Sequence, residues 1–156
     1  MAMKPAEDDE ERKALLDELT VEENRAAKLA HRFDLLAHGF WWGALVGTAL
    51  AAVAGFIITQ IPSLKGYVQP WVVSLFATIA GALEIARTRA CWRAKADCFY
   101  ALRDSVSKVR LQVRYEGIVL AAASKAFTAA KDAFGARMHA INEEREARAA
   151  ASHEIK

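Results

Sequence analysis

Two long stretches of the chain carry no charged side chain, and they predict a pair of membrane-spanning helices. Residues 39–61 form one uncharged run of 23 residues, and residues 70–83 form a second run of 14. A helix rises about 1.5 Å per residue, so about 20 apolar residues cross the hydrocarbon core of a bilayer. The first run meets that length by itself, and the second extends to 70–86 if Glu84 is tolerated. A short outer loop is predicted over 62–69.

Helical patterns also flank the two spans, where charged residues are dense. The expected segments are a disordered acidic tail over 1–9, a cytoplasmic helix over 10–38 leading into the membrane, a basic cytoplasmic helix over 87–116, a second cytoplasmic helix over 118–141 and a polar tail over 142–156. Gly117 is the predicted break between the last two helices. The predicted fold is an all-α membrane protein: a two-helix transmembrane hairpin with long N- and C-terminal cytoplasmic helices, assembled into an oligomeric helical bundle.

Apolar residues after the second span recur at heptad spacing. The a and d positions are Trp92, Phe99, Leu102, Val106, Val109 and Val113. Lys95 occupies the first d position and departs from the pattern. Such a seam is typical of helices that pack together as a coiled coil, so we expect it to set the number of subunits.

Small residues recur every four positions in the first span, at Gly43, Gly47, Ala51 and Gly55. A face of this kind lets helix backbones approach closely in lipid. It can serve packing against the second span or packing between subunits, and the sequence leaves both open.

The second span is more polar, with Ser74, Thr78, Gly81 and Glu84 as pore or gate candidates. An ionisable residue inside a span is by default a functional hypothesis. The competing interpretation of Glu84 is an interfacial ion pair with Arg87, three residues further along the helix. The two hydroxyl groups can equally be satisfied by carbonyl groups of the preceding turn.

Basic residues follow the second span closely, at Arg87, Arg89, Arg93 and Lys95, whereas the outer loop carries only Lys65. This asymmetry predicts that both termini face the cytoplasm, with the four basic residues contacting lipid head groups of the inner membrane. Residues 1–38 hold 10 acidic and 6 basic residues. The acidic arm is therefore an alternative partner for the basic helix, and an anionic ligand such as a nucleotide is a third. Nucleic acid is not an expected partner.

No established catalytic, phosphate-binding or metal-binding motif is present in the sequence, so we expect neither an enzyme, nor a cofactor, nor a metal site. His31 and His38 lack a third ligand at metal spacing, and Cys91 and Cys98 fit no zinc or redox motif. The N-terminus lacks the basic and apolar regions of a signal peptide, and none is expected.

The layout over about residues 25–115 resembles the SLATT group, the two-transmembrane effector domains of bacterial nucleotide-signalling conflict systems. The shared outline is a helix leading into a first span rich in Trp and small residues, a short turn, a second span, and a basic helix containing Phe99, Tyr100 and Leu102. The resemblance implies an oligomeric effector that forms pores or perturbs the inner membrane when a separate partner senses a signal. It implies no catalytic residues.

Together these patterns lead us to expect a homo-oligomeric bacterial inner-membrane protein that forms an ion-conducting pore gated through its cytoplasmic helices. The alternatives are a non-conducting adaptor whose cytoplasmic coiled coil recruits a soluble partner, and a lytic, holin-like protein.

Overall fold

The computed structural model describes residues 5–60 and 69–154, and within these ranges the chain is helical almost throughout, with no β-strand. The helices are α1 (Pro5–Gln60), α2 (Pro70–Ala90), α3 (Trp92–Leu111) and α4 (Leu120–Glu154), with one π-helical turn, η2 (Gln112–Glu116), at the end of α3. The all-α prediction is confirmed. Two helical segments, one ending at Gln60 and one beginning at Pro70, are long and apolar enough to span a membrane.

Several helices extend beyond their expected ends. The helix α1 begins at Pro5, inside the segment expected to be disordered, and continues without a break through the first predicted span. Proline suits the first turn of a helix, and the acidic residues after it favour the positive end of the helix dipole. The helix α4 continues to Glu154 through the expected polar tail, because Ala, Glu and Arg there are strong helix formers. Most of the predicted outer loop, 62–68, lies outside the described residues, as does Ile61.

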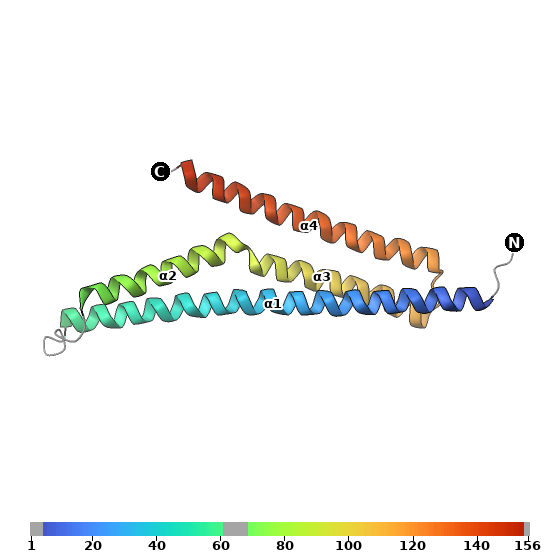
Figure 1. The fold of residues 1–156 in the computed structure, drawn as a ribbon, viewed down its shortest axis with the longest axis horizontal. Helices are drawn as coiled ribbons and strands as arrows, with labels where there is room; N and C mark the ends of the chain where they lie inside the picture. The colour runs from blue at the N-terminus through green and yellow to red at the C-terminus, as the bar shows by residue number, and fades with distance from the viewer. Residues whose placement is uncertain (1–4, 61–68, 155–156) are drawn as a thin grey trace. The chain divides into compact units, whose positions relative to one another are not determined.

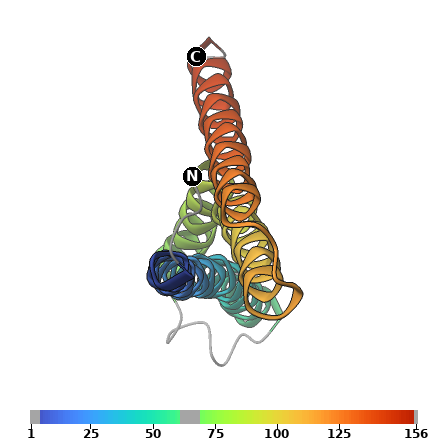
Figure 2. The ribbon, with the colours of Figure 1, turned by 90° about the vertical axis from the view of Figure 1, so that its right-hand side faces the viewer.

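The chain divides into two compact units. The first, which we call the bundle, comprises residues up to Phe33 and Arg93–Ala147, and so contains the start of α1, α3 and most of α4. The second, the hairpin, comprises Asp34–Trp92 and the chain from Arg148 onward, and its main elements are the end of α1 and all of α2. Figures 1 and 2 give two views of these helices.

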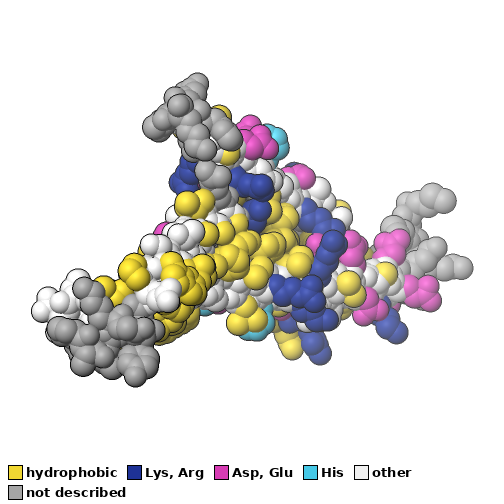
Figure 3. All heavy atoms as spheres, turned by 60° about the vertical axis from the view of Figure 1, so that its left-hand side comes forward, with side chains coloured by type: hydrophobic (Ala, Val, Ile, Leu, Met, Phe, Trp, Pro, Cys, Tyr) yellow, Lys and Arg dark blue, Asp and Glu magenta, His cyan; other side chains and the backbone are white. Residues whose placement is uncertain are grey.

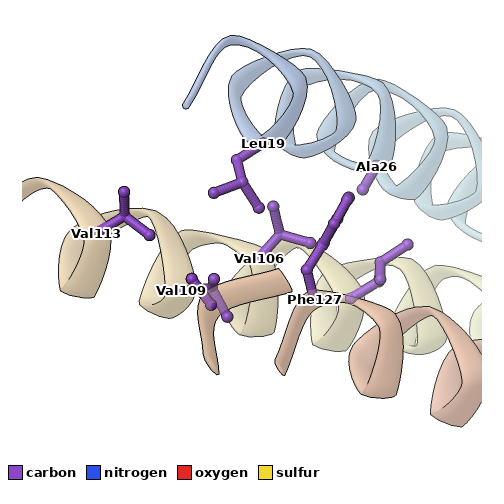
Figure 4. Packing of buried hydrophobic residues seen from close by; sticks show 8 residues of the cluster. Leu19, Ala26, Val106, Val109, Val113 and Phe127 are labelled. Atoms are coloured by element: carbon purple, nitrogen blue, oxygen red, sulfur yellow. The ribbon is translucent and has the colours of Figure 1, made fainter. Parts of the chain in front are cut away.

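Three helices form the core of the bundle. Leu19 and Ala26 of α1 point toward α3, and Phe127 of α4 reaches the same cluster (Figure 4). The buried members are Leu19, Ala26, Leu102, Val106, Val109, Val113, Ala123 and Phe127. The segment after Gly117 therefore folds back onto α1 and α3, which the sequence did not decide.

Charged contacts join the same helices at the edge of this core. Arg110 on α3 pairs with Glu23 on α1 at 3.1 Å, and Lys131 on α4 lies 3.4 Å from Glu18 on α1. The pairing of the acidic arm with the basic helix, one of the alternatives that the sequence left open, thus occurs within one chain.

Arg12 ties the start of α1 to the end of α3. Its guanidinium group donates from both Nε, at 3.1 Å, and Nη2 to the carbonyl oxygen of Val113. That carbonyl lies in the π-helical turn, which ends at Gly117 in the left-handed conformation, with φ of 63°. The last carbonyl groups of a helix have no backbone N–H partner within the helix, so Arg12 supplies hydrogen-bond donors at this end.

We expect Arg12→Ala to lower the free energy of unfolding of the bundle by about 1–3 kcal/mol, because hydrogen bonds from a charged donor are worth about that much. Chemical denaturation followed by circular dichroism would measure the loss. Lys13→Ala, at the exposed neighbouring position, is the matched control. Equal midpoints for the two variants would contradict a capping role for Arg12.

Candidate functional site

The closest approach in the hairpin unit lies between glycines of α1 and the middle of α2. A Cβ atom built on Gly47 would lie 3.1 Å from the Cβ atom of Ala80, and one built on Gly43 would lie 3.0 Å from Cδ1 of Leu83. Both distances are shorter than ordinary van der Waals contact. Two of the predicted packing glycines therefore do bring the helices together within one chain.

The packing face follows a different spacing from the predicted one. A Cβ atom on Gly55 would meet nothing within 4 Å, so the fourth member of the predicted stripe is not at the contact. Instead, Ala44 and Ala54 are buried, and with Gly47 and the half-buried Ala51 they recur at intervals of three, four and three. This is the heptad-like spacing of helices that cross at a shallow angle.

Outside the Gly47–Ala80 contact, the surface of each helix divides into two flanks, one on either side of the contact. The flank of a residue follows from its angle around the helix axis, counted from the contact at about 100° per residue. One flank carries small and hydroxyl side chains: Thr48, Ala52, Gly55 and Thr59 on α1, and Ser74, Ala77, Thr78, Gly81 and Thr88 on α2. The other carries exposed large side chains: Trp42, Val46, Leu50, Val53 and Phe56 on α1, and Leu75 and Ile79 on α2. Yellow hydrophobic spheres dominate the visible surface of the hairpin in Figure 3.

The two flanks with small residues lie on the same side of the hairpin. The contacts Gly43–Leu83 and Gly47–Ala80 run in opposite directions along the two sequences, so the helices are antiparallel. In an antiparallel pair, flanks displaced in the same rotational sense from the contact fall on the same side. We call this side the small face and the opposite side the bulky face. Three exposed large residues also lie on this side: Leu45, at its outer edge between the Gly43 and Gly47 contacts, and Trp41 and Ile85, toward the Cys91 end of α2.

The threonine hydroxyl groups on the small face are satisfied within their own helices. Thr48 donates to the carbonyl of Ala44 at 2.9 Å, and Thr59 donates to that of Gly55 at 3.0 Å. Thr78 donates to the carbonyl of Ser74 at 2.7 Å, as the alternative interpretation of this residue predicted. Their protons therefore need no further partner, while the oxygen atoms remain acceptors. The exposed Ser74, Thr78 and Gly81 all lie on this face.

Glu84 is paired within its own helix. Its Oε1 atom accepts a hydrogen bond from Nη2 of Arg87, one turn further along α2. The hydroxyl of Thr88 donates to the backbone carbonyl of Glu84, at 3.0 Å. Glu84 lies beside the small face, toward the α1 contact, and the Arg87 pair accounts for its charge.

The predicted lipid-contacting residues lie in both units. Arg87 belongs to the hairpin and is half-buried, with its Nε atom buried and lacking a hydrogen-bond partner. Arg93 and Lys95 belong to the bundle, where Arg93 is exposed and Lys95 is half-buried. The side chain of Arg89 lies outside the described residues.

The heptad seam is filled by the chain itself. Leu102, Val106, Val109 and Val113 are buried in the bundle core, between α1 and α4. Phe99 stacks on Phe33 with ring centroids 5.6 Å apart and also contacts Phe134 at 4.8 Å. Trp92, the first seam position, packs instead against Phe40 in the hairpin unit, at 4.3 Å. These residues pack within one subunit, so their burial requires no second chain, contrary to the expectation that they set subunit number.

Neither cysteine forms a disulfide. Cys98 is buried beside a cavity of about 80 Å³ between α3 and α4, whose lining includes Phe134 and Arg137. Burial raises the pKa of the Cys98 thiol, so the reactive thiolate is disfavoured.

His38 lies on α1 with Nδ1 3.0 Å from the carbonyl oxygen of Asp34. Across 5–60 and 69–154, no group of three His, Cys, Asp or Glu side chains is placed to hold a metal ion.

One break in the helices was not predicted from the sequence. The helix α2 ends at Ala90, the next residue Cys91 adopts the left-handed conformation with φ of 50°, and α3 begins at Trp92. The prediction placed the end of the span at Ala86 and continued the following helix directly from it. No Gly or Pro marks the true position, so the local sequence offers no signal for it.

The chain matches no protein-family model, no curated protein and no solved structure.

Proposed function

We propose that this chain is a homo-oligomeric protein of the bacterial inner membrane. Its hairpins span the bilayer with both termini in the cytoplasm, and several copies form an ion-conducting pore. The bundle lies on the cytoplasmic side and controls the pore, with no enzymatic activity and no cofactor. A membrane-perturbing effector activated by a separate signal-sensing protein, as the SLATT resemblance implies, is the form of this function that we favour. An anionic nucleotide that binds the basic residues is the alternative stimulus.

The exposure of the apolar segments supports a membrane location. Only 17% of the apolar stretch in α1 and 6% of that beginning in α2 is buried within the chain. The core helix of a soluble protein would have most of such a stretch covered. Exposed apolar patches of this extent mark surfaces that meet lipid or another protein. The bias of Lys and Arg toward the end of α2 and the start of α3 supports cytoplasmic termini.

The single observation that carries the pore proposal is the division of the hairpin into a small face and a bulky face. In lipid there is no hydrophobic drive between helices, and small residues mark the surfaces where helices pack closely. The bulky face suits contact with acyl chains, and the small face suits neighbouring copies of the hairpin. A single pair of helices encloses no channel, so conduction requires a ring of copies with the hydroxyl groups of the small face near its centre.

Two adjacent positions of α2 test this arrangement. Gly81 lies on the small face and Ala82 on the bulky face, both are exposed, and a Cβ atom on Gly81 meets nothing within 4 Å. We expect Gly81→Leu to lower both the oligomeric fraction and the conductance in planar bilayers by about tenfold, because overpacking an interface costs about 1–3 kcal/mol. Ala82→Leu should leave both within about twofold, since the change faces lipid.

Native mass spectrometry of the same samples gives the number of subunits. A dimer that carries no current, or equal effects of the two substitutions, would contradict the pore. Currents that survive Gly81→Leu unchanged would place conduction elsewhere on the molecule.

The adaptor alternative loses its main support in this structure. It relied on a free heptad seam that could recruit a soluble partner. Most of that seam is buried between α1 and α4 of the same chain. A partner would therefore have to bind another surface of the bundle.

A further inference from the structure

A small cavity lies between α3 and α4 inside the bundle, and the proposed function makes no use of it. Its volume is about 80 Å³, and all the residues that line it belong to the bundle. A cavity needs about 10–15 Å³ to hold one water molecule, and benzene, with six carbon atoms, fits a cavity of about 150 Å³. By the same ratio, the cavity suits a chain of about three carbon atoms.

Small side chains on both helices leave this space. On α3 the lining includes Cys98, Ala101 and Ser105, at intervals of three and four residues that place them on one face of the helix. On α4 it includes Ala130 and Ala133. The hydroxyl of Ser105 donates to the carbonyl oxygen of Ala101 at 2.9 Å, so it has no proton left for a ligand. The walls of the cavity are therefore mainly apolar.

Among the described residues that line the cavity, Arg137 alone carries a charge. Its guanidinium group makes no hydrogen bond or ion pair within residues 5–60 and 69–154. Its positive charge acts on the Cys98 thiol, where it lowers the pKa against the larger effect of burial. The charge of Asp97 raises the same pKa by a smaller amount. The cavity thus combines apolar walls with one unpaired cation.

We propose that this cavity binds a short-chain monocarboxylate, with its alkyl chain between α3 and α4 and its carboxylate on Arg137. A planar carboxylate accepts two parallel hydrogen bonds from a guanidinium group. A single unpaired cation matches a single negative charge, which favours a monocarboxylate over a dianionic phosphate. Arg137 is exposed, so the carboxylate stays at the solvent edge and only the alkyl chain enters the cavity. The bound molecule contacts both helices and stabilises α4 against α3.

A series of carboxylates tests the fit of the alkyl chain. Calorimetric titration of the full-length protein in detergent would compare acetate, propionate, butyrate, hexanoate and octanoate. Each methylene that enters the cavity should strengthen binding about fourfold, and the gain should stop after butyrate, whose chain fills the space. An unbroken rise in affinity up to octanoate would overturn the site, because it would show partitioning without a cavity of fixed size. Butylamine that bound as tightly as butyrate would overturn the role of charge.

Three variants separate the charge from the space. We expect Arg137→Gln to weaken butyrate about fivefold and to leave the binding of uncharged butanol unchanged. Ala133→Leu places a larger side chain in the lining and should weaken both ligands at least tenfold. Ala136→Leu, exposed on α4 outside the lining, is the matched control and should change neither by more than about twofold. Equal effects of the two leucine substitutions, or no effect of Arg137→Gln, would overturn the proposal.

Cys98 reports occupancy of the cavity without any substitution. Its side chain lines the cavity and is 7% exposed. Butyrate at ten times its Kd should slow modification of Cys98 by iodoacetamide about tenfold, measured by mass spectrometry of peptides. Cys91, in the hairpin, should react at an unchanged rate. Equal rates at Cys98 with and without bound butyrate would overturn the site and leave the cavity as a gap in packing. None of these measurements depends on conduction.

Discussion

Gly47→Leu should separate the two helices of the hairpin. A Cβ atom at this position already lies 3.1 Å from the Cβ atom and 3.5 Å from the Cα atom of Ala80, so the remaining atoms of leucine have no space. Overpacking of this kind costs about 1–3 kcal/mol, and backbone atoms on the far side cannot move aside as a side chain can. Hydrogen exchange of α2 amides in detergent micelles should rise as the contact opens, and the thermal midpoint should fall.

Gly39→Leu and Gly55→Leu are the controls for this change. A Cβ atom at either position meets nothing within 4 Å, so leucine fits there without displacing the partner helix. All three substitutions gain helix propensity equally, by about 1 kcal/mol, which leaves the contact with Ala80 as the difference between them. Equal melting of the three variants would refute the close approach at Gly47. The pore proposal adds that Gly55→Leu, on the small face, reduces oligomerisation while Gly39→Leu, on the bulky face, does not.

Leu19→Ala should unfold the bundle. Leu19 is fully buried and contacts the cluster formed by α3 and α4, so its truncation leaves a cavity at the junction of three helices (Figure 4). Large-to-small substitutions of this kind cost about 2–5 kcal/mol. Hydrogen exchange should increase across α3 and the first half of α4, whereas amides in the second half of α2 should keep their protection.

Val21→Ala provides the comparison on the same helix. Val21 is 66% exposed, and its truncation should cost no more than about 0.5 kcal/mol. If Leu19→Ala were as mild as Val21→Ala, the three-helix core would not be the source of the stability of the bundle. Loss of protection in α2 as well would mean that the hairpin depends on the bundle.

The sequence predicted helices well because its signals are local. Uncharged runs identified both long apolar helical segments, and Gly117 lies at the left-handed position where the π-helical turn after α3 ends. The break at Cys91 was not predictable, because cysteine carries no preference for the left-handed conformation. The predicted second cytoplasmic helix ended at residue 141, whereas α4 continues to Glu154. The polarity of 142–154 was given more weight in the prediction than its high helix propensity.

The partners of the predicted faces were harder to infer than the faces themselves. A heptad pattern states that Val106 and Val109 must be buried, but it does not state whether their partners come from the same chain. The answer depended on α4 folding back, which follows from contacts between residues far apart in sequence. In the first predicted span, the four-residue stripe correctly placed Gly43 and Gly47 at the contact with α2. It also placed Gly55 there, and only the crossing geometry of the two helices shows that Gly55 lies outside the contact.

The separation of contacting residues along the sequence also determines the order in which their contacts can form during synthesis. The hairpin contacts join Gly43 and Gly47 to residues fewer than 45 positions away, so this pair of helices can close early in translation. The contacts of Arg12 with Val113 and of Leu19 with the cluster that contains Phe127 can form only after about 100 further residues have been synthesised. The acidic first half of α1 therefore emerges from the ribosome long before its partners exist. Until they arrive, its apolar stripe is exposed, and a chaperone or targeting factor has its opportunity to bind the nascent chain there.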